Sequence, residues 1–254
     1  MRYVLSQSSR MILAQLAQER TLCAFDFDGT LAPIVENPDQ AVLPHSTRQL
    51  LARLAALYPC VVLSGRSRAD LLGKLSGISF ERVFGSHGAD GEGSKPKRQP
   101  RIQRWKASLE LELGQVPGVW VEDKGLSLAV HYRQSPHRAE VLRQILRATK
   151  SLERARVIGG KYVVNLVVDS DPHKGTALLS ERERLRCDSV LYVGDDQNDE
   201  DAFAIGGRTI AVRIGRTLRS RASYYLRAQN EMDTLLDLMV TLRERLSSAV
   251  PSQS

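Results

Sequence analysis

The chain has 254 residues, of which 42% are hydrophobic and 26% are charged, as is usual for a folded globular protein. No apolar run approaches the roughly 20 residues that a membrane-spanning helix needs, so we expect no membrane association. Three widely spaced cysteines suit neither a disulfide framework nor a metal cluster, and we expect free thiols in a reducing cytoplasm.

The formal net charge of +7 is unevenly distributed along the sequence. Residues 95–161 contain 15 Lys or Arg against 6 Asp or Glu, whereas the rest of the chain is slightly acidic. A basic surface can attract nucleic acid or a phosphorylated small molecule. Because this segment has few aromatic residues for base stacking and no nucleic-acid-binding motif, we expect a phosphorylated small molecule as the partner and no nucleic acid.

The first third of the sequence alternates between strand and helix patterns. Residues 1–20 predict an amphipathic helix and lack the apolar core of a signal peptide. The alternation that follows predicts a parallel sheet with crossover helices. The expected elements are a strand at 22–27, a helix at 46–57, a strand at 60–64, a helix at 67–75 and a strand at 82–86.

The pattern changes in the middle of the chain. Residues 91–97 have the composition of a linker. They precede an expected helix at 102–113, a hairpin at 120–133 with its turn near Lys124-Gly125, a helix at 136–150 and a strand pair at 155–168. This order predicts a separate α+β unit at 95–169, inserted into a core formed by residues 1–94 and 170–254.

The alternation of strands and helices resumes after the insert. The expected elements are helices at 174–186 and 198–205, strands at 189–193, 208–212 and 223–226, and a closing helix for which Asn230 is the predicted N-cap. The closing helix repeats leucines at helical spacing, which we assign to the core.

The segment from Leu22 to Leu31 is the most informative part of the sequence, because an apolar strand runs directly into two carboxylates. Strand alternation places Asp26 and Asp28 on the same side. Two anions held so close repel each other, and a divalent cation would relieve the repulsion. Oxygen ligands suit Mg²⁺ better than zinc.

This segment resembles the first signature of the haloacid dehalogenase (HAD) superfamily, Asp-x-Asp-Gly-Thr. Three later segments resemble the remaining signatures in the expected order, namely 61–66 ending in Ser64-Gly65-Arg66, Lys174-Gly175, and the acidic loop that follows strand 189–193. The resemblance implies an α/β fold with a Rossmann-like core and parallel sheet, and an inserted α+β cap of the type called C2.

The resemblance also implies chemical roles for these residues. Asp26 would attack phosphorus and form an aspartyl-phosphate. Asp28 would protonate the leaving oxygen and then accept a proton from the hydrolytic water. Ser64 and Lys174 would bind the phosphoryl oxygens.

The same resemblance implies Mg²⁺ as the cofactor. Its ligands would be the Asp26 carboxylate, the Asp28 main-chain carbonyl and Asp195. Asp196 and Asp199 would orient the water ligands of the metal.

Nearly the whole chain is similar to the trehalose-6-phosphate phosphatase family. The similarity rests on Phe84-Gly85-Ser86-His87-Gly88-Ala89 and on the run from Glu122 to Arg133. It implies hydrolysis of trehalose 6-phosphate, a step of trehalose biosynthesis, by a phosphatase that we expect to be monomeric. The implied substrate-binding residues are Gly65, Arg66, His87, Glu122, Lys124, His131, Arg133 and Asn165.

Two residues depart from the family pattern. Asn165 stands where the family usually has Glu, and Asn198 stands where it usually has Thr. The first change leaves open a phosphatase for another sugar or glycoside phosphate, of the sucrose- or glucosylglycerol-phosphate type. A non-catalytic sugar-phosphate sensor is a further alternative, although a sensor has no need of both a nucleophile and an acid.

Overall fold

The structure, a computed structural model, describes residues 1–91, 100–160 and 162–249. The predicted linker at 91–97 therefore lies outside the described residues, apart from Gly91. Within the part of the chain that is described, no helix is both long enough and apolar enough to cross a membrane.

A seven-stranded sheet forms the larger part of the molecule. Its strands lie in the order β1-β11-β10-β9-β2-β3-β4, and every neighbouring pair is parallel. The strands are β1 (Arg2–Tyr3), β2 (Thr21–Phe25), β3 (Cys60–Leu63), β4 (Arg82–Phe84), β9 (Ser189–Gly194), β10 (Thr209–Ile214) and β11 (Tyr224–Leu226). The predicted parallel sheet is confirmed.

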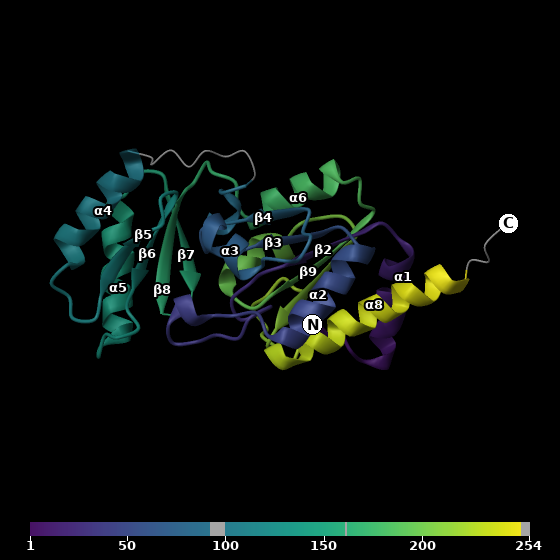
Figure 1. The fold of residues 1–254 in the computed structure, drawn as a ribbon. Coiled ribbons are helices and arrows are strands. Elements are labelled where there is room, and N and C mark those ends of the chain that lie inside the picture. The colour runs from purple at the N-terminus through teal and green to yellow at the C-terminus, as the bar shows by residue number, and fades with distance from the viewer. Residues whose placement is uncertain (92–99, 161, 250–254) are drawn as a thin grey trace.

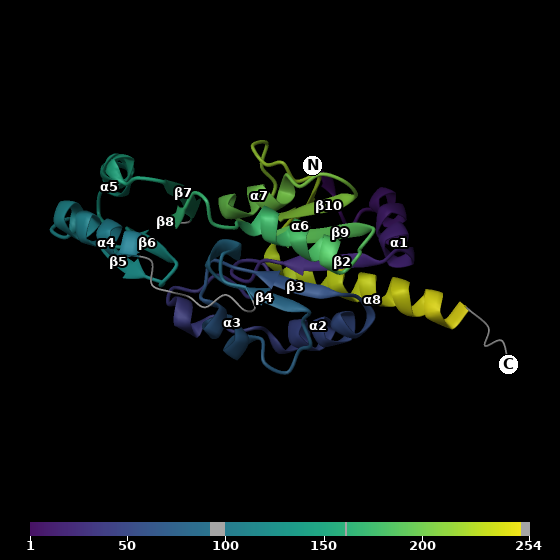
Figure 2. The same cartoon turned by 90° about the horizontal axis from the view of Figure 1, so that it is seen from above.

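Helices cover both faces of this sheet (Figure 2). The side chains of β2 alternate between the two faces of the sheet. Phe25 belongs to the hydrophobic cluster on one face, and Leu22 belongs to the cluster on the other face. A parallel sheet covered in this way buries both faces, which explains the uniformly apolar strands. The helices on the face of Phe25 are α1 (Arg10–Gln18), α2 (His45–Leu57), α3 (Arg68–Lys74) and α8 (Met232–Ala249). The helices on the face of Leu22 are α6 (Lys174–Arg184) and α7 (Glu200–Phe203).

A four-stranded antiparallel sheet lies beside the larger sheet (Figure 1). It comprises β5 (Trp120–Asp123), β6 (Ser127–His131), β7 (Ala155–Gly160) and β8 (Val163–Val168), in the order β5-β6-β8-β7. Helices α4 (Pro100–Leu113) and α5 (Arg138–Ala148) pack on the face that points away from the larger sheet and share a hydrophobic cluster with the strands. The predicted fold class, an α/β core with an added α+β unit, is confirmed.

The sequence-based prediction is wrong at both ends of the chain. Residues 1–20 do not form one helix, because Arg2–Tyr3 pairs with β11 at the sheet edge and α1 begins at Arg10. Asn230 is not an N-cap either, since it lies in a 3-10 turn before α8 begins at Met232. Both differences follow from contacts between distant parts of the chain, which local patterns do not encode.

Candidate active site

The predicted catalytic residues lie at the carboxyl ends of neighbouring strands. Asp26 follows β2, Asp195 follows the adjacent β9, and Ser64 follows β3 on the other side of β2. The chain winds in opposite directions from β2 and β9, so their carboxyl ends form the crevice in which open α/β sheets bind ligands. The sheet thus assembles residues that are far apart in sequence.

Three carboxylates gather in this crevice. Asp26, Asp195 and Asp199 each place one oxygen within 4.8 Å of the others. Gly29 allows this arrangement, because its φ of +81° suits glycine and a β-carbon there would collide with the Asp195 carboxylate. The Asp-Gly of the first motif therefore has a structural reason as well as a chemical one.

Asp199 is fully buried and accepts four hydrogen bonds. Its Oδ1 accepts from Lys174 Nζ and from the Tyr192 hydroxyl, both at 2.7 Å. Its Oδ2 accepts from the main-chain N–H groups of Asp195 and Asp196, at 2.9 and 3.0 Å. Each of its two carboxylate oxygens thus accepts from two protein donors, and Asp199 fixes the conformation of the acidic loop.

Lys174 is the first residue of α6, and its ammonium group is buried between three acceptors. Nζ donates to Asp26 Oδ1 at 2.7 Å, to Asp199 Oδ1 at 2.7 Å and to Asn198 Oδ1 at 2.8 Å. Although burial opposes protonation, the two carboxylates raise the pKa of Lys174 above its usual value. Because all three N–H groups are engaged, Lys174 orients Asp26 and Asn198 rather than presenting a free donor.

One lysine does not balance the charge of the carboxylates. Burial, repulsion by Asp199 and repulsion by Asp28 raise the pKa of Asp26 to about 8, against the attraction of Lys174. Burial and repulsion by Asp26 raise the pKa of Asp195 to about 9. The negative charge of these buried carboxylates is only partly balanced by Lys174, and they offer only oxygen ligands. Such a group is suited to a divalent cation such as Mg²⁺.

Asp28 is held by an arginine of the second motif. Arg66 Nε and Nη2 donate to the two oxygens of Asp28 at 2.7 and 2.6 Å, and Nη1 donates to Asp70 at 2.8 Å. Nη2 also donates to the carbonyl of Pro38. The Arg66 guanidinium is thus engaged by protein acceptors, and it holds Asp28 at the wall of the cavity.

A strained turn brings His87 to the wall of the crevice. Ser86 and His87 have φ of 48° and 60°, in the left-handed region that non-glycine residues rarely occupy. The turn is fixed to the second motif, because His87 N–H donates to the Ser64 carbonyl at 2.9 Å. Gly65 makes room for the imidazole, since a β-carbon there would meet the ring.

The imidazole of His87 is 3% exposed and lacks a partner of good geometry among the described residues. Burial and the charges of Lys174 and Lys124 lower its pKa to about 3, and the Asn165 amide lies near enough to oppose this shift. A neutral imidazole offers one donor and one acceptor. An unpaired buried ring in a ligand cavity is therefore able to bind a hydroxyl or a phosphoryl oxygen.

The four-stranded sheet supplies the opposite wall. Its register places Glu122, Ala129 and Asn165 in one row across β5, β6 and β8. Glu122 accepts a hydrogen bond from His131 Nε2 at 2.8 Å and lies 3.6 Å from Lys124 Nζ. Although burial acts in the other direction, these two partners lower the pKa of Glu122.

A cavity of about 1050 Å³ lies between the two walls. All predicted site residues line it except Lys174 and Asp199, which support it from behind. The residues that it brings together are Asp26, Asp28, Ser64, Gly65, Arg66, His87, Glu122, Lys124, His131, Arg133, Asn165, Asp195 and Asp196.

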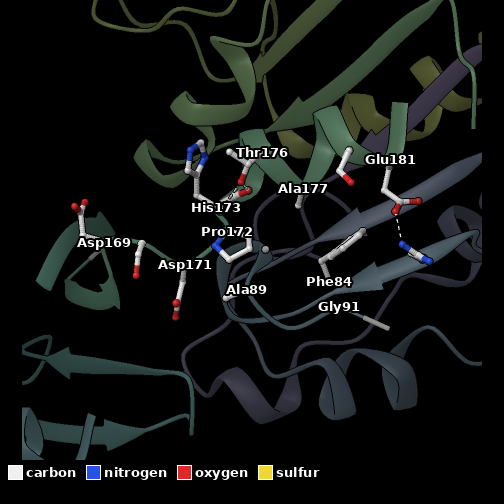
Figure 3. A pocket seen from close by; sticks show the side chains of 14 residues that line it. Phe84, Ala89, Gly91, Asp169, Asp171, Pro172, His173, Thr176, Ala177 and Glu181 are labelled. Carbon is white, nitrogen blue, oxygen red and sulfur yellow. Dashed lines mark hydrogen bonds and ion pairs between the residues drawn. The ribbon is translucent and has the colours of Figure 1, made fainter. Parts of the chain in front are cut away.

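A second cavity of about 640 Å³ contains none of these residues. Figure 3 shows it between Phe84 and Ala89 on one side and Pro172, His173 and the start of α6 on the other. Its wall includes Glu181, whose carboxylate accepts a hydrogen bond from Arg82 at 2.7 Å. This cavity is separate from the acidic crevice, and we assign no chemistry to it.

Several residues at or near the larger cavity are not among the predicted site residues. Trp120 and the loop 34–39 line it without belonging to any motif. Arg156 of β7 donates to Asp201 of α7 at 3.0 Å and so joins the two walls. Only Trp120 carried a signal, as an aromatic residue at the start of the predicted hairpin.

Comparison with known proteins gives the same family from sequence and the same fold from structure. A family model described as trehalose-phosphatase matches residues 24–227. Trehalose-phosphate phosphatase of Mycobacterium tuberculosis (strain ATCC 25618 / H37Rv) is 37% identical over 198 residues, which are 72% of this chain and 50% of the relative. The corresponding protein of Mycobacterium marinum is 34% identical over 215 residues, covering 78% and 55%. The chain thus spans about half the length of the curated relatives that it matches.

Solved structures of similar fold include the C-terminal domain of Candida albicans trehalose-6-phosphate phosphatase, with a TM-score of 0.77 and 21% identity, covering 91% of this chain and 96% of that one. Aspergillus fumigatus trehalose-6-phosphate phosphatase has a TM-score of 0.66 and 22% identity, with 95% and 99% covered. A haloacid dehalogenase-like hydrolase from B. subtilis has a TM-score of 0.64 and 15% identity, with 85% and 98% covered. At these identities the structural likeness concerns the fold.

Proposed function

The chain belongs to the trehalose-phosphatase family of the HAD superfamily, and on that premise we propose that it hydrolyses trehalose 6-phosphate to trehalose and inorganic phosphate. The observation that supports this most directly is the position of Asp26. Its carboxylate lies at the carboxyl end of β2, lines the cavity and is oriented by Lys174. A buried, fixed carboxylate at this position suits nucleophilic attack on a bound phosphoryl group.

In the first step, an Asp26 oxygen attacks phosphorus and the bond between phosphorus and the sugar oxygen breaks. Asp28 delivers a proton to the departing oxygen, which leaves as the hydroxyl of trehalose. In the second step, water attacks the phosphorus of the aspartyl-phosphate, Asp28 takes a proton from that water, and the bond to Asp26 breaks. Inorganic phosphate is released and both aspartates return to their starting forms.

Arg66 would act on this sequence through Asp28. Its two hydrogen bonds, one to each oxygen, fix the direction of the Asp28 carboxylate and occupy both of its oxygens. Proton delivery therefore requires at least one Arg66 contact to loosen once substrate is bound. Arg66 is in this account a positioning residue for the acid and base.

The residues fit Mg²⁺ as the cofactor, and we propose that Asp26, the Asp28 carbonyl and Asp195 hold it. The bound ion would neutralise charge on the phosphoryl oxygens, so that an anionic carboxylate can approach an anionic phosphate. Asp196 lines the cavity and would contact a water ligand. Asp199, with four protein donors, would keep this loop in place.

The phosphoryl oxygens would be bound by Ser64 and by the main chain around Gly65. Ser64 is almost fully buried at the end of β3 and lines the cavity. Lys174 would contribute by charge, and a direct contact would require it to exchange one of its three acceptors. His87 would add a neutral donor at the same wall.

We propose that residues 95–169 form a cap that selects the sugar. In support, this region has its own hydrophobic cluster, and its strands together with the residues that adjoin them bring Glu122, Lys124, His131, Arg133 and Asn165 to the cavity. Donors and acceptors of this kind match the hydroxyls of a sugar. We also propose that the chain is a cytoplasmic monomer, consistent with three free, buried cysteines.

The test is phosphate release in the presence of Mg²⁺ from trehalose 6-phosphate, sucrose 6-phosphate, glucosylglycerol phosphate and glucose 6-phosphate, with Asp26→Asn as the control. Preference for trehalose 6-phosphate, lost in Asp26→Asn, is the expected result. Turnover of none of these compounds would contradict the proposal and favour the sensor.

A phosphatase for another sugar or glycoside phosphate is the second candidate. It is favoured by Asn165, which is 5% exposed and places an amide in the cavity wall where the family usually has a carboxylate. An amide both donates and accepts, whereas a carboxylate only accepts. Faster turnover of sucrose 6-phosphate or glucosylglycerol phosphate in the same panel would establish this alternative.

A further inference from the structure

Trp120 is the large aromatic residue of the cavity that has no part in the chemistry described above. It opens β5, it is 51% exposed, and it lines the cavity. The other tryptophan of the chain, Trp105, is 3% exposed within the hydrophobic cluster of the same region. Leaving an indole half exposed gives up hydrophobic stabilisation that burial would provide.

The indole is held in a fixed orientation. It stacks on the imidazole of its cross-strand partner His131, with centroids 3.9 Å apart and planes inclined by 8°. The imidazole is in turn fixed by its 2.8 Å hydrogen bond to Glu122. Trp120 therefore presents a rigid surface, and little conformational entropy would be lost when a ligand contacts it.

One face of the indole has no strand against it. β5 is an edge strand of the four-stranded sheet, so the ring is covered by His131 on one side only. Among the described residues, Ile34, which is 47% exposed, is the other large apolar side chain exposed at this cavity, whereas Leu111 and Leu218 lie outside it. The exposure of Trp120 is thus combined with a site, which is the combination that marks a binding surface.

The neighbours of Trp120 indicate which ligand would cover it. On the same face of the sheet, Glu122 and Lys124 lie beside the indole and offer an acceptor and a donor. A pyranose ring has an apolar face of C–H groups and a rim of hydroxyls, which this combination of flat aromatic surface and polar rim can match. A phosphate alone has no apolar face.

The size of the cavity points to a ligand with two parts. At about 1050 Å³ it lies at the upper end of the range for small-molecule sites. The phosphoryl group would occupy the wall that carries Asp26, whereas Trp120 belongs to the opposite wall. A second sugar ring would fill the space between a phosphorylated ring and the indole.

We propose that Trp120, braced by His131, is the stacking surface for the non-phosphorylated ring of a disaccharide or glycoside phosphate. The proposal rests on the proposed phosphatase function and adds to it the residue that distinguishes sugar phosphates with a second ring from hexose phosphates. Trp120 is then a specificity-determining residue and takes no part in the transfer step.

Kinetics of Trp120→Leu and Trp120→Phe test this role. For trehalose 6-phosphate we expect KM to rise about 5- to 10-fold in Trp120→Leu, with kcat nearly unchanged and much of the loss restored in Trp120→Phe. For glucose 6-phosphate both constants should stay as in the wild type. Leu111→Ala, which removes an exposed apolar side chain outside the cavity, is the matched control and should leave KM and kcat unchanged for both substrates.

A second readout does not depend on activity. In the wild-type protein, acrylamide should quench the fluorescence of Trp120, which is 51% exposed, far more than that of Trp105, which is 3% exposed. Trehalose should protect Trp120 from quenching in a saturable manner, whereas glucose should not. If no sugar phosphate is turned over but trehalose still protects Trp120, the phosphatase function fails and the sugar surface stands. If trehalose 6-phosphate is turned over but trehalose gives no protection and Trp120→Leu keeps the wild-type KM, this inference is overturned.

Discussion

The two walls of the cavity hold their charged residues in opposite ways. On the wall formed by the seven-stranded sheet, Lys174, Asp26 and Asp199 are at most 5% exposed and bonded to one another. On the wall formed by the four-stranded sheet, the side chains of Glu122, Lys124 and His131 are 38%, 18% and 21% exposed. Buried charges interact strongly and are costly to leave unpaired, whereas partly exposed charges interact weakly and exchange partners easily.

This difference indicates a division of labour. Chemistry on phosphorus needs charges whose positions do not change, and the buried network provides them. Selection of a sugar needs hydrogen-bonding groups that can be replaced without unfolding the protein. We therefore expect substitutions on the first wall to affect stability and turnover, and those on the second wall to affect mainly KM.

Lys174→Met should have the largest effect. It leaves Asp26 and Asp199 buried without their counter-charge, which should lower the free energy of unfolding by about 3–5 kcal/mol and abolish turnover. Urea denaturation and phosphate release measure the two effects. Lys106→Met is the matched control, because the ion pair of Lys106 with Glu110 at 3.7 Å on α4 is partly exposed and should contribute about 0.5 kcal/mol or less.

The buried carboxylates predict how stability depends on pH. Their folded-state pKa values, about 8 for Asp26 and about 9 for Asp195, lie above those of an unfolded chain. The folded state thus holds these protons more tightly, and the metal-free protein should lose stability as pH rises from about 4 through about 9. Urea midpoints in a chelator measure this trend.

Mg²⁺ provides the control for the pH experiment. Because the ion favours the ionised carboxylates, it should restore stability most at the alkaline end of the range. Asp195→Asn should flatten the dependence on pH and weaken the effect of Mg²⁺. If Asp195→Asn has the same pH dependence of stability and the same response to Mg²⁺ as the wild type, the proposal that Asp195 holds the metal is contradicted.

Glu122→Gln tests the second wall. It weakens the contacts to His131 and Lys124, and we expect KM for trehalose 6-phosphate to rise about 10-fold, with kcat and the unfolding midpoint nearly unchanged. Glu110→Gln on α4 is the control of identical chemistry outside the cavity. A loss of kcat that equals the change in kcat/KM would place Glu122 with the reacting groups instead.

The smallest effect is expected at the contact between the walls. Arg156 and Asp201 form a partly exposed ion pair, 25% and 40% exposed, so a double-mutant cycle of Arg156→Ala and Asp201→Ala should give a coupling below about 1 kcal/mol.

An active site shared by two walls must open to admit a disaccharide. Small-angle scattering should therefore show compaction with a substrate analogue, and an unchanged profile would rule out that motion.

The sequence predicted the positions of Asp26, Ser64, Lys174 and Asp195, because each lies at the end of a strand or the start of a helix in a local motif. The resemblance to the family also implied Glu122 and Asn165 as substrate-binding residues, and both line the same cavity.

What the sequence did not predict depends on contacts between distant residues. The four donors to Asp199, the hold of Arg66 on Asp28 and the pairing of Arg2 with Tyr224 are set only when the sheet assembles. The stacking of Trp120 on His131 depends likewise on the register of β5 and β6. Charge state follows from the same assembly, because burial raises the pKa of Asp26 and lowers that of His87.

The most direct test of the account is to locate the phosphoryl group on the enzyme during turnover. The wild type and Asp26→Asn are mixed with trehalose 6-phosphate and Mg²⁺, quenched in acid and digested, and the peptide that carries the phosphoryl group is identified by mass spectrometry. The account predicts phosphorylation of Asp26 in the wild type, and neither phosphorylation nor phosphate release in Asp26→Asn. A phosphoryl group on another residue, or turnover by Asp26→Asn at a rate near that of the wild type, would contradict it.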